Sequence, residues 1–376
     1  MNRSRLFRSY HILVLPLSLT LAAITGSARA FESGCFLSAV EADDRASGDF
    51  AGAVVAARTD MVIMGAPGDT NESGFGAGAV YVFRHVGGQW VQSQKLFPGS
   101  LNDFDNFGTA AMDLNNDRLI IGCPNHDAPT NNEGAVYIYT LVNGTSWAIS
   151  AQINAPPGTP VEGNFGNIAA IDGEWAVVGV PEKEGFFGAL NAGGWYIYRH
   201  TGPWSLYDTS PFMAPNAMVG YSVDIEGNTM VAGAPGSEIN GKVQAGSVLT
   251  YTLNNASPPQ WVQGPSLVPN DPQAFGNFGK QVATNGVFTF VASEGIDVNG
   301  QLDAGAVYAF LGKAQVAKFT APVVEAGARF GFKIALDGNT LVVNDVQGHV
   351  YRYRWNGATT AYLDGTINPP SPWNGV

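Results

Sequence analysis

One unit recurs through most of the sequence and constrains the fold more than any single residue. The tryptophans Trp90, Trp147, Trp204 and Trp261 stand 57 residues apart. Each unit has the same order of parts: a Phe-Gly pair, a short apolar stretch, a turn, an apolar run that ends in Gly-Ala-Pro or a variant, a polar loop and a stretch like Gly-Ala-Val-Tyr. The units begin near residues 50, 107, 165, 219, 278 and 330. A recurrence of this length is typical of a fold assembled from copies of one supersecondary unit.

Each unit is predicted to contain four short strands. The first two are joined by a tight turn such as Asp172-Gly173, because glycine beside a small polar residue supplies the positive φ of a two-residue hairpin. The second strand is a nearly unbroken apolar run, as in 175–178, which suits a strand buried on both faces. Its terminal proline removes a backbone donor and ends the ladder. The third strand, as in 134–139, ends on an aromatic residue, and the fourth begins near the tryptophan. No helical period of useful length is present.

These units predict an all-β fold, a β-propeller of six four-stranded blades. A single unit has too little core to fold alone, so its aromatic and aliphatic faces must be buried against neighbouring units. The regular tryptophans are therefore expected to pack between blades rather than to serve as sugar platforms. A lead-in strand around Phe36 could complete the last blade, and a seventh blade built from both termini stays open as an alternative.

The motif set resembles the FG-GAP repeat of the integrin α-subunit propeller and its bacterial relatives. The resemblance covers residues 50 to about 355 and rests on pairs such as Phe107-Gly108, on Gly65-Ala66-Pro67 and its variants, and on the stretch 78–83 and its counterparts. It implies a ligand seat on one rim of a propeller.

The resemblance also implies calcium in the hairpin between the first and second strands of several blades. In this sequence those hairpins are only short turns, and the residues most similar to the calcium motif are Asp113, Asn115 and Asp117. Calcium takes six to eight oxygen ligands, more than these turns offer. We therefore expect no metal site and no cofactor, although calcium stays open.

The first 30 residues are predicted to be a secretory signal peptide. Arg3, Arg5 and Arg8 precede an apolar run from 12 to 24, and small residues end at Ala30, where cleavage is expected. The mature chain, residues 31–376, would then be one propeller domain, secreted, periplasmic or on the cell surface. No other stretch is apolar enough to enter a membrane.

The charge of the mature chain argues against nucleic acid or anionic lipid as a partner. Removing residues 1–30 takes away four arginines and no acid, which leaves 15 Lys+Arg against 31 Asp+Glu, a net charge of −16. Phosphate backbones and anionic lipids are themselves negative. Cys35 and Cys123 are the two cysteines, and sequence alone does not show whether they pair.

The polar loops between the second and third strands are the predicted binding site. In a four-stranded meander these loops emerge on the same face as the connections between blades, and five of the six are long: 68–77, 125–133, 182–192, 236–245 and 294–304. Long polar loops on one face of a rigid scaffold are where recognition is usually placed. The predicted ligand-binding residues are Asp69, Asn71, Glu72, Asp127, Asn132, Glu133, Glu182, Glu184, Glu238, Asp297 and Asp303. The predicted function is a non-catalytic binding or adhesion module for a protein or glycan.

An enzyme and a purely structural surface protein are the alternatives. Some propellers are glycan hydrolases or lyases, and paired carboxylates can serve as acid and base. His85 and His200 occupy the same repeat position and are interpreted as structural, while His126 beside Asp127 could be a ligand or a base. Neither Gly-x-Ser-x-Gly nor His-Glu-x-x-His occurs, and no catalytic residue is assigned.

Overall fold

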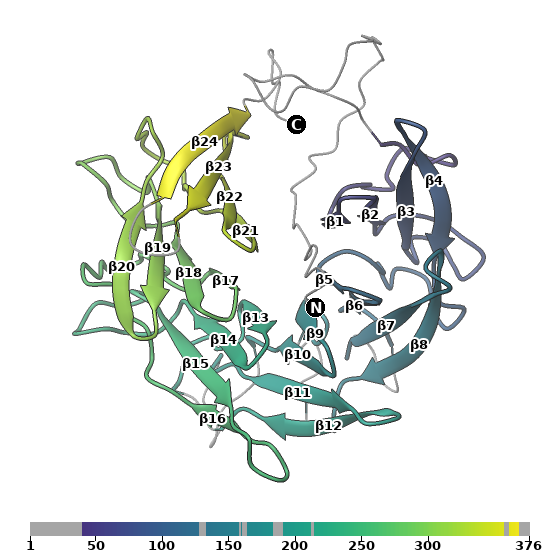
Figure 1. Ribbon diagram of the computed structural model, residues 1–376, viewed down its shortest axis with the longest axis horizontal. Coiled ribbons are helices and arrows are strands. Elements are labelled where there is room, and N and C mark those ends of the chain that lie inside the picture. Colours follow the sequence, from purple (N-terminus) through teal and green to yellow (C-terminus); the bar gives the residue numbers. More distant parts are fainter. Residues whose placement is uncertain are drawn as a thin grey trace, which may run out of the picture.

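The computed structural model describes residues 40–127, 133–157, 159, 164–182, 191–211, 214–356 and 361–367. Its regular elements are all strands, and they form six sheets that follow one another around a ring (Figure 1). None of the described segments is a helix with the length and apolar character needed to cross a bilayer.

Each sheet contributes one strand to each of four concentric positions. The innermost strands are β1 (Val55–Arg58), β5 (Met112–Asn115), β9 (Ile168–Asp172), β13 (Val223–Glu226), β17 (Gln281–Thr284) and β21 (Lys333–Asp337). The second strands are β2 (Met61–Ala66), β6 (Arg118–Cys123), β10 (Trp175–Gly179), β14 (Thr229–Ala234), β18 (Phe288–Ser293) and β22 (Thr340–Asn344). The third strands are β3 (Ala79–Val86), β7 (Ala135–Val142), β11 (Trp195–His200), β15 (Ser247–Leu253), β19 (Ala306–Leu311) and β23 (Val350–Trp355). The outermost strands are β4 (Gln89–Leu96), β8 (Ser146–Asn154), β12 (Trp204–Thr209), β16 (Trp261–Gln263), β20 (Ala314–Phe319) and β24 (Ala361–Ile367).

Within every sheet the four strands pair in sequence order and antiparallel, so the fold is a six-bladed β-propeller. This confirms the predicted fold class and blade content. The innermost strand of each blade packs against that of the next, from β1 and β5 through to β17 and β21. Between the sixth and first blades the ring of described strands is interrupted (Figure 1). The terminal segments that would form a seventh blade, 31–39 and 368–376, lie outside the described residues.

The repeated order of parts has a structural reason at the boundaries between the first five blades. A Cβ on Gly122, at the end of the second strand of one blade, would overlap the carbonyl oxygen of Gly166, the Phe-Gly glycine of the next blade. Gly166 itself has φ +91°, and a Cβ on it would overlap the carbonyl oxygen of Ala135. The glycine of Gly-Ala-Pro and the glycine of Phe-Gly thus let two backbones approach closely across a blade boundary.

The first unit departs from the predicted alignment by one residue. Gly52 (φ +94°) receives the same bond pattern as the other Phe-Gly glycines, its N–H donating to the carbonyl of Gly65 at 2.8 Å. The residue before it is Ala51, so Ala51 takes the place of the phenylalanine, whereas Phe50 is 66% exposed. Phe107, Phe165, Phe278 and Phe330, by contrast, are fully buried. Phe50 is therefore a surface residue.

The core lies between blades, as expected for units that cannot fold alone. One apolar cluster joins Ile63 and Val82 of the first blade to Phe107, Ile121 and Tyr137 of the second. The tryptophan of a blade reaches back to the preceding blade: Trp147 Nε1 donates to Met61 Sδ at 3.3 Å, and Trp261 meets Trp175 edge to face at 5.5 Å. The prediction that these tryptophans pack between blades is confirmed for both residues.

Candidate functional site

The loops between second and third strands share one face of the ring with the connectors between blades. In a sequential antiparallel meander the loop after the second strand and the connector after the fourth strand leave at the same end of the sheet. Backbone hydrogen bonds join them: the N–H of Phe107 donates to Ala77 at 2.9 Å, and that of Phe278 donates to Ala245 at 3.1 Å. We call this side of the ring, made of these loops and connectors, the loop face.

The opposite side carries the short hairpins, and its acids bond to the next blade. The Asp113 carboxylate accepts the N–H of Ile171 at 2.7 Å, and the Asp224 carboxylate accepts that of Thr284 at 2.6 Å. Asn115 donates its side-chain amide to Asp172 at 2.8 Å. Asp113 and Asp224 on the inner strands, and Asn115 where a hairpin begins, therefore fasten one inner strand to the next.

The predicted ligand-binding residues have different environments. Those that are exposed are Glu72, Asp127, Glu182, Glu238, Asp297 and Asp303. Those that are half-buried are Asn71 and Glu133, while Asn132 and Glu184 lie outside the described residues. Asp69 is buried, with 3% of its surface exposed. The loop face thus gathers exposed carboxylates, but Asp69 is not among them.

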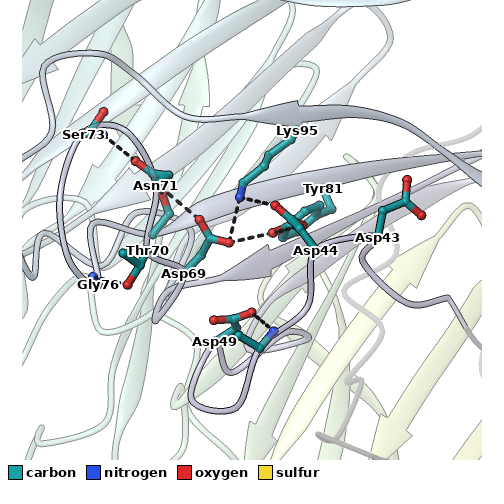
Figure 2. A network of polar contacts seen from close by, with 12 residues as sticks. Asp43, Asp44, Asp49, Asp69, Thr70, Asn71, Ser73, Gly76, Tyr81 and Lys95 are labelled. Atoms are coloured by element: carbon teal, nitrogen blue, oxygen red, sulfur yellow. Dashed lines mark hydrogen bonds and ion pairs between the residues drawn. The ribbon is translucent and has the colours of Figure 1, made fainter.

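Asp69 belongs to a network of polar side chains, in which Asn71 Nδ2 donates to Asp69 Oδ1 at 3.2 Å (Figure 2). Lys95 Nζ lies 2.9 Å from Asp69 Oδ2 and 2.7 Å from Asp44 Oδ2. The Tyr81 hydroxyl lies 2.6 Å from Asp69 Oδ2 and 2.8 Å from Asp44 Oδ1, so its single proton can be donated to either carboxylate. Two carboxylates surround one ammonium group, which holds the lead-in segment and the first loop against the third and fourth strands.

The network shifts the pKa values of Tyr81, Lys95 and Asp44. Burial and the two carboxylates raise the pKa of Tyr81, so the phenol stays protonated as a donor. Burial acts to lower the pKa of Lys95, but hydrogen bonds and attraction from Asp44 and Asp69 outweigh it and raise that pKa. Burial acts to raise the pKa of Asp44, but hydrogen bonds from Lys95 and Tyr81 lower it.

Similar clusters, in which a third-strand tyrosine and a basic side chain bond one aspartate, occur in other blades. Tyr308 donates to Asp271 at 2.9 Å while Lys318 pairs with the same carboxylate at 2.6 Å. Tyr351 and His349 both bond Asp345. Because the same third-strand tyrosine is used in several blades, we assign these clusters to the scaffold.

The second blade holds the group of side chains best suited to a metal or to nucleophilic chemistry. Asp105, Cys123 and His126 are all buried, and one ligand atom from each lies within 4.8 Å of the others. No other trio of this kind occurs in the part of the chain that the structure describes. His126 Nδ1 lies 2.7 Å from Asp105 Oδ2, and Nε2 lies 3.3 Å from the Tyr137 hydroxyl.

This trio is not arranged as a catalytic triad. The Cys123 thiol donates to the backbone carbonyl of Asp105 at 3.3 Å rather than to His126, and burial raises the pKa of that thiol. A nucleophilic cysteine needs an exposed, low-pKa thiolate next to a base. The internal hydrogen bonds account for all three side chains, which therefore fasten the connector to the loop.

The inner strands β5, β9, β13, β17 and β21 line a small cavity at the ring axis. Its volume is about 50 Å³, and its polar lining is Asp113, Asp224 and Thr284. Ligand pockets for small molecules usually measure about 300–1,000 Å³. The cavity has room for ordered water but not for a sugar ring.

Exposed apolar side chains mark the loop face at repeated positions. The N–H of Phe104 in a connector donates to the carbonyl of Phe75 in the preceding loop at 2.9 Å, and the N–H of Phe275 donates to Val243 in the same way, also at 2.9 Å. The third equivalent bond joins Gly327 to Leu302. Phe75 and Phe104 are 63% and 60% exposed, and their rings meet edge to face at 5.4 Å. We call these three loop–connector contacts the rim pairs.

Phe75, Val243 and Leu302 lie within the predicted binding loops, but no member of the rim pairs is among the predicted ligand-binding residues. The available signal was position: Phe75, Val243 and Leu302 each stand three residues before the glycine that opens a third strand, and Phe104 and Phe275 each stand three residues before the phenylalanine of Phe-Gly. A large apolar residue at a repeated place in a polar loop is unusual for a solvated segment.

The architecture and the matched sequence segments agree on the repeat. The sequence profile of the FG-GAP repeat matches residues 90–139 and 314–350, each running from an outermost strand to the third strand of the following blade. The chain is built of FG-GAP repeats. Both segments cross a boundary between blades: Gly65 meets Gly108 at the first, and Ala292 meets Gly331 at the second.

Other comparisons bear on the fold alone. No curated protein sequence matches the FG-GAP chain. A solved structure from Bacteroides uniformis, named as a putative 6-phosphogluconolactonase, is similar with a TM-score of 0.51 over 82% of each chain, at 10% sequence identity. At that identity the likeness supports a common propeller architecture.

Proposed function

We propose that this FG-GAP propeller is an exported, non-catalytic binding or adhesion module that recognises a protein or a glycan through its loop face. The observation that carries the proposal is the gathering of long loops and connectors on one side of a rigid ring, with Glu72, Glu238, Asp297 and Asp303 exposed there. A scaffold held by blade-to-blade bonds fixes these loops: residues such as Ile296 and Val298 belong to the core, while the four carboxylates stay exposed.

Enzymatic function finds less support. The trio of Asp105, Cys123 and His126 is buried and internally hydrogen-bonded, and the axial cavity is small. An enzyme acting on a glycan would need ionisable groups that converge on a space large enough for a sugar.

A binding screen with matched variants tests the proposal. The mature protein would be presented to a glycan array and a panel of purified cell-surface proteins, with calcium and with a chelator. Neutralising loop-face acids by Asp297→Asn and Asp303→Asn should weaken a ligand found this way. Asp117→Asn, on the hairpin side, is the control and should not. A ligand lost through the control alone would contradict the loop-face assignment.

Export is tested separately. Expression of the full chain in a secreting bacterial host, followed by amino-terminal mass spectrometry of the protein outside the cytoplasm, should give a chain that begins at Phe31. Retention in the cytoplasm with residues 1–30 intact would contradict it.

A further inference from the structure

We propose that the rim pairs bind a polypeptide with apolar side chains flanked by lysine or arginine, rather than a glycan. The inference rests on the proposed binding role of the loop face and selects between its two ligand classes. It starts from the exposed side chains of Phe75, Phe104, Phe275 and Leu302, all of which lie in loops or connectors of this face.

Exposed large apolar residues also occur singly elsewhere, as at Phe50, Val287 and Val323, but those of the rim pairs recur at the same repeat position on one face. Phe275 is 59% exposed and Leu302 is 65% exposed, whereas the Phe-Gly phenylalanines are fully buried. The chain therefore has buried places for phenylalanine in the same connectors, yet it puts a second phenylalanine outside. Apolar groups repeated on one face of a soluble protein mark an interaction surface.

The repetition of the rim pairs matches an extended or multi-point partner. Each pair is built by the same backbone bond between a loop and the next connector, so each stands at a boundary between blades. The pairs at the fourth–fifth and fifth–sixth boundaries are neighbours around the ring, and the pair Phe75–Phe104 lies at the first–second boundary. A partner can therefore place one apolar side chain at each boundary. Aromatic and large apolar residues are the usual anchors of protein interfaces.

The charge beside the rim pairs selects a basic partner. Asp103 accepts the backbone N–H of Phe75 through Oδ1 at 2.8 Å, so a carboxylate lies at the backbone of the pair Phe75–Phe104. Asp303, next to Leu302 in the chain, donates its N–H to the Asp297 carboxylate at 3.0 Å, and both residues are exposed. The exposed bases in the described part of the loop face and lead-in are Arg45, Lys242, which precedes Val243, and Arg329, whose N–H donates to the carbonyl of Asp303 at 3.0 Å. Exposed acids outnumber them, and include Asp103, Glu238, Asp297, Asp303 and Glu325. Opposite charge on a partner would steer its approach and penalise acidic competitors.

The geometry of the pair Phe75–Phe104 is poorly suited to a sugar. The two rings are inclined at 69°, so they do not present one flat platform. Phenylalanine offers no hydrogen bond, and Asp103 Oδ1 is already occupied by a backbone N–H. A sugar placed here would lose water from its hydroxyl groups without full replacement, which is costly. An aliphatic or aromatic side chain has no such cost.

Three synthetic peptides of equal length provide the test: lysine alternating with leucine, lysine alternating with serine, and glutamate alternating with leucine. Isothermal titration calorimetry with the mature protein should show tightest binding for the lysine–leucine peptide. The doubly substituted protein Phe75→Ser/Phe104→Ser should bind it at least about tenfold more weakly. Val287→Ser removes a 62% exposed apolar side chain from a hairpin on the opposite side, and should leave the affinity unchanged. Thermal melts verify that all variants are folded.

The outcomes separate this inference from the proposed function. Equal affinity of the phenylalanine variant and the parent, or equal binding of the lysine–serine peptide, would overturn the rim-pair inference. If a glycan binds the parent and the phenylalanine variant equally but is lost with Asp297→Asn/Asp303→Asn, the loop face binds a ligand and the inference fails. If peptides, glycans and surface proteins all fail to bind the folded protein, both proposals fail.

Discussion

Replacing Gly166 by alanine should destabilise the propeller far more than the same replacement at Gly173. Both glycines have a positive φ, +91° at Gly166 and +56° at Gly173. Left-handed backbone costs an alanine about 1–2 kcal/mol at either place. At Gly173, in the β9–β10 hairpin, a Cβ would meet nothing within 4 Å. At Gly166 it would overlap the carbonyl oxygen of Ala135, part of the neighbouring blade's backbone.

The backbone contact adds a packing penalty, because the third strand of the second blade must move to admit the methyl group. Overpacking of this kind costs about 1–3 kcal/mol. The free energy of unfolding should therefore fall by about 1–2 kcal/mol for Gly173→Ala and by about 2–5 kcal/mol for Gly166→Ala. Urea denaturation followed by tryptophan fluorescence measures both. Equal losses for the two variants would refute the argument that the Phe-Gly glycine is required by the approach of two blades.

Other perturbations test the contacts between and within blades. Trp147→Ala should lower the free energy of unfolding by about 3–5 kcal/mol, because it empties a buried site against Met61; a loss under about 1 kcal/mol would contradict inter-blade packing. Lys95→Met should cost stability at neutral pH. The folded protein lowers the pKa of Asp44 and raises the pKa of Lys95. The stability lost by Lys95→Met relative to the parent should therefore shrink as pH falls below the ordinary Asp pKa of 3.8 and as pH rises above the ordinary Lys pKa of 10.5. Melting temperatures of parent and variant that run parallel across this pH range would argue against the network. Cys123→Ala should cost only about 1 kcal/mol, because Ala66 and Ala234 occupy the same repeat position, and the native thiol should react with an aromatic disulfide reagent only on unfolding.

The sequence predicted the blades well because their signals are local. The turn at Asp172-Gly173, the apolar run of β10 and the aromatic ends of the third strands each depend on a few adjacent residues. The sequence places the start of the first unit one residue too early, because Phe50 is a phenylalanine but stands two residues before Gly52 instead of directly before it. Only the bond of Gly52 to Gly65 shows which residue fills the core position.

The site was less predictable because its residues acquire their roles through partners distant in the chain. Asp69 is a carboxylate in a polar loop, as expected of an exposed ligand-binding residue, yet it is buried and bonded to Lys95 and Tyr81. Phe75 and Phe104 are 29 positions apart in the sequence, and the backbone bond that makes them a pair exists only once the connector reaches the loop of the preceding blade. A pattern of polar loops predicts which side of the propeller binds a ligand. Which side chains are exposed on that side depends on contacts between blades.

The most direct test of the loop face as the binding surface is hydrogen–deuterium exchange of the mature protein with and without a ligand recovered from the screen. We expect slower exchange in segments 67–78, 235–246 and 294–305 and in the connectors bonded to them, with no change in the hairpins around Asn116, Gly173 and Gly286. Protection confined to those hairpins, with the loop segments unchanged, would contradict the account.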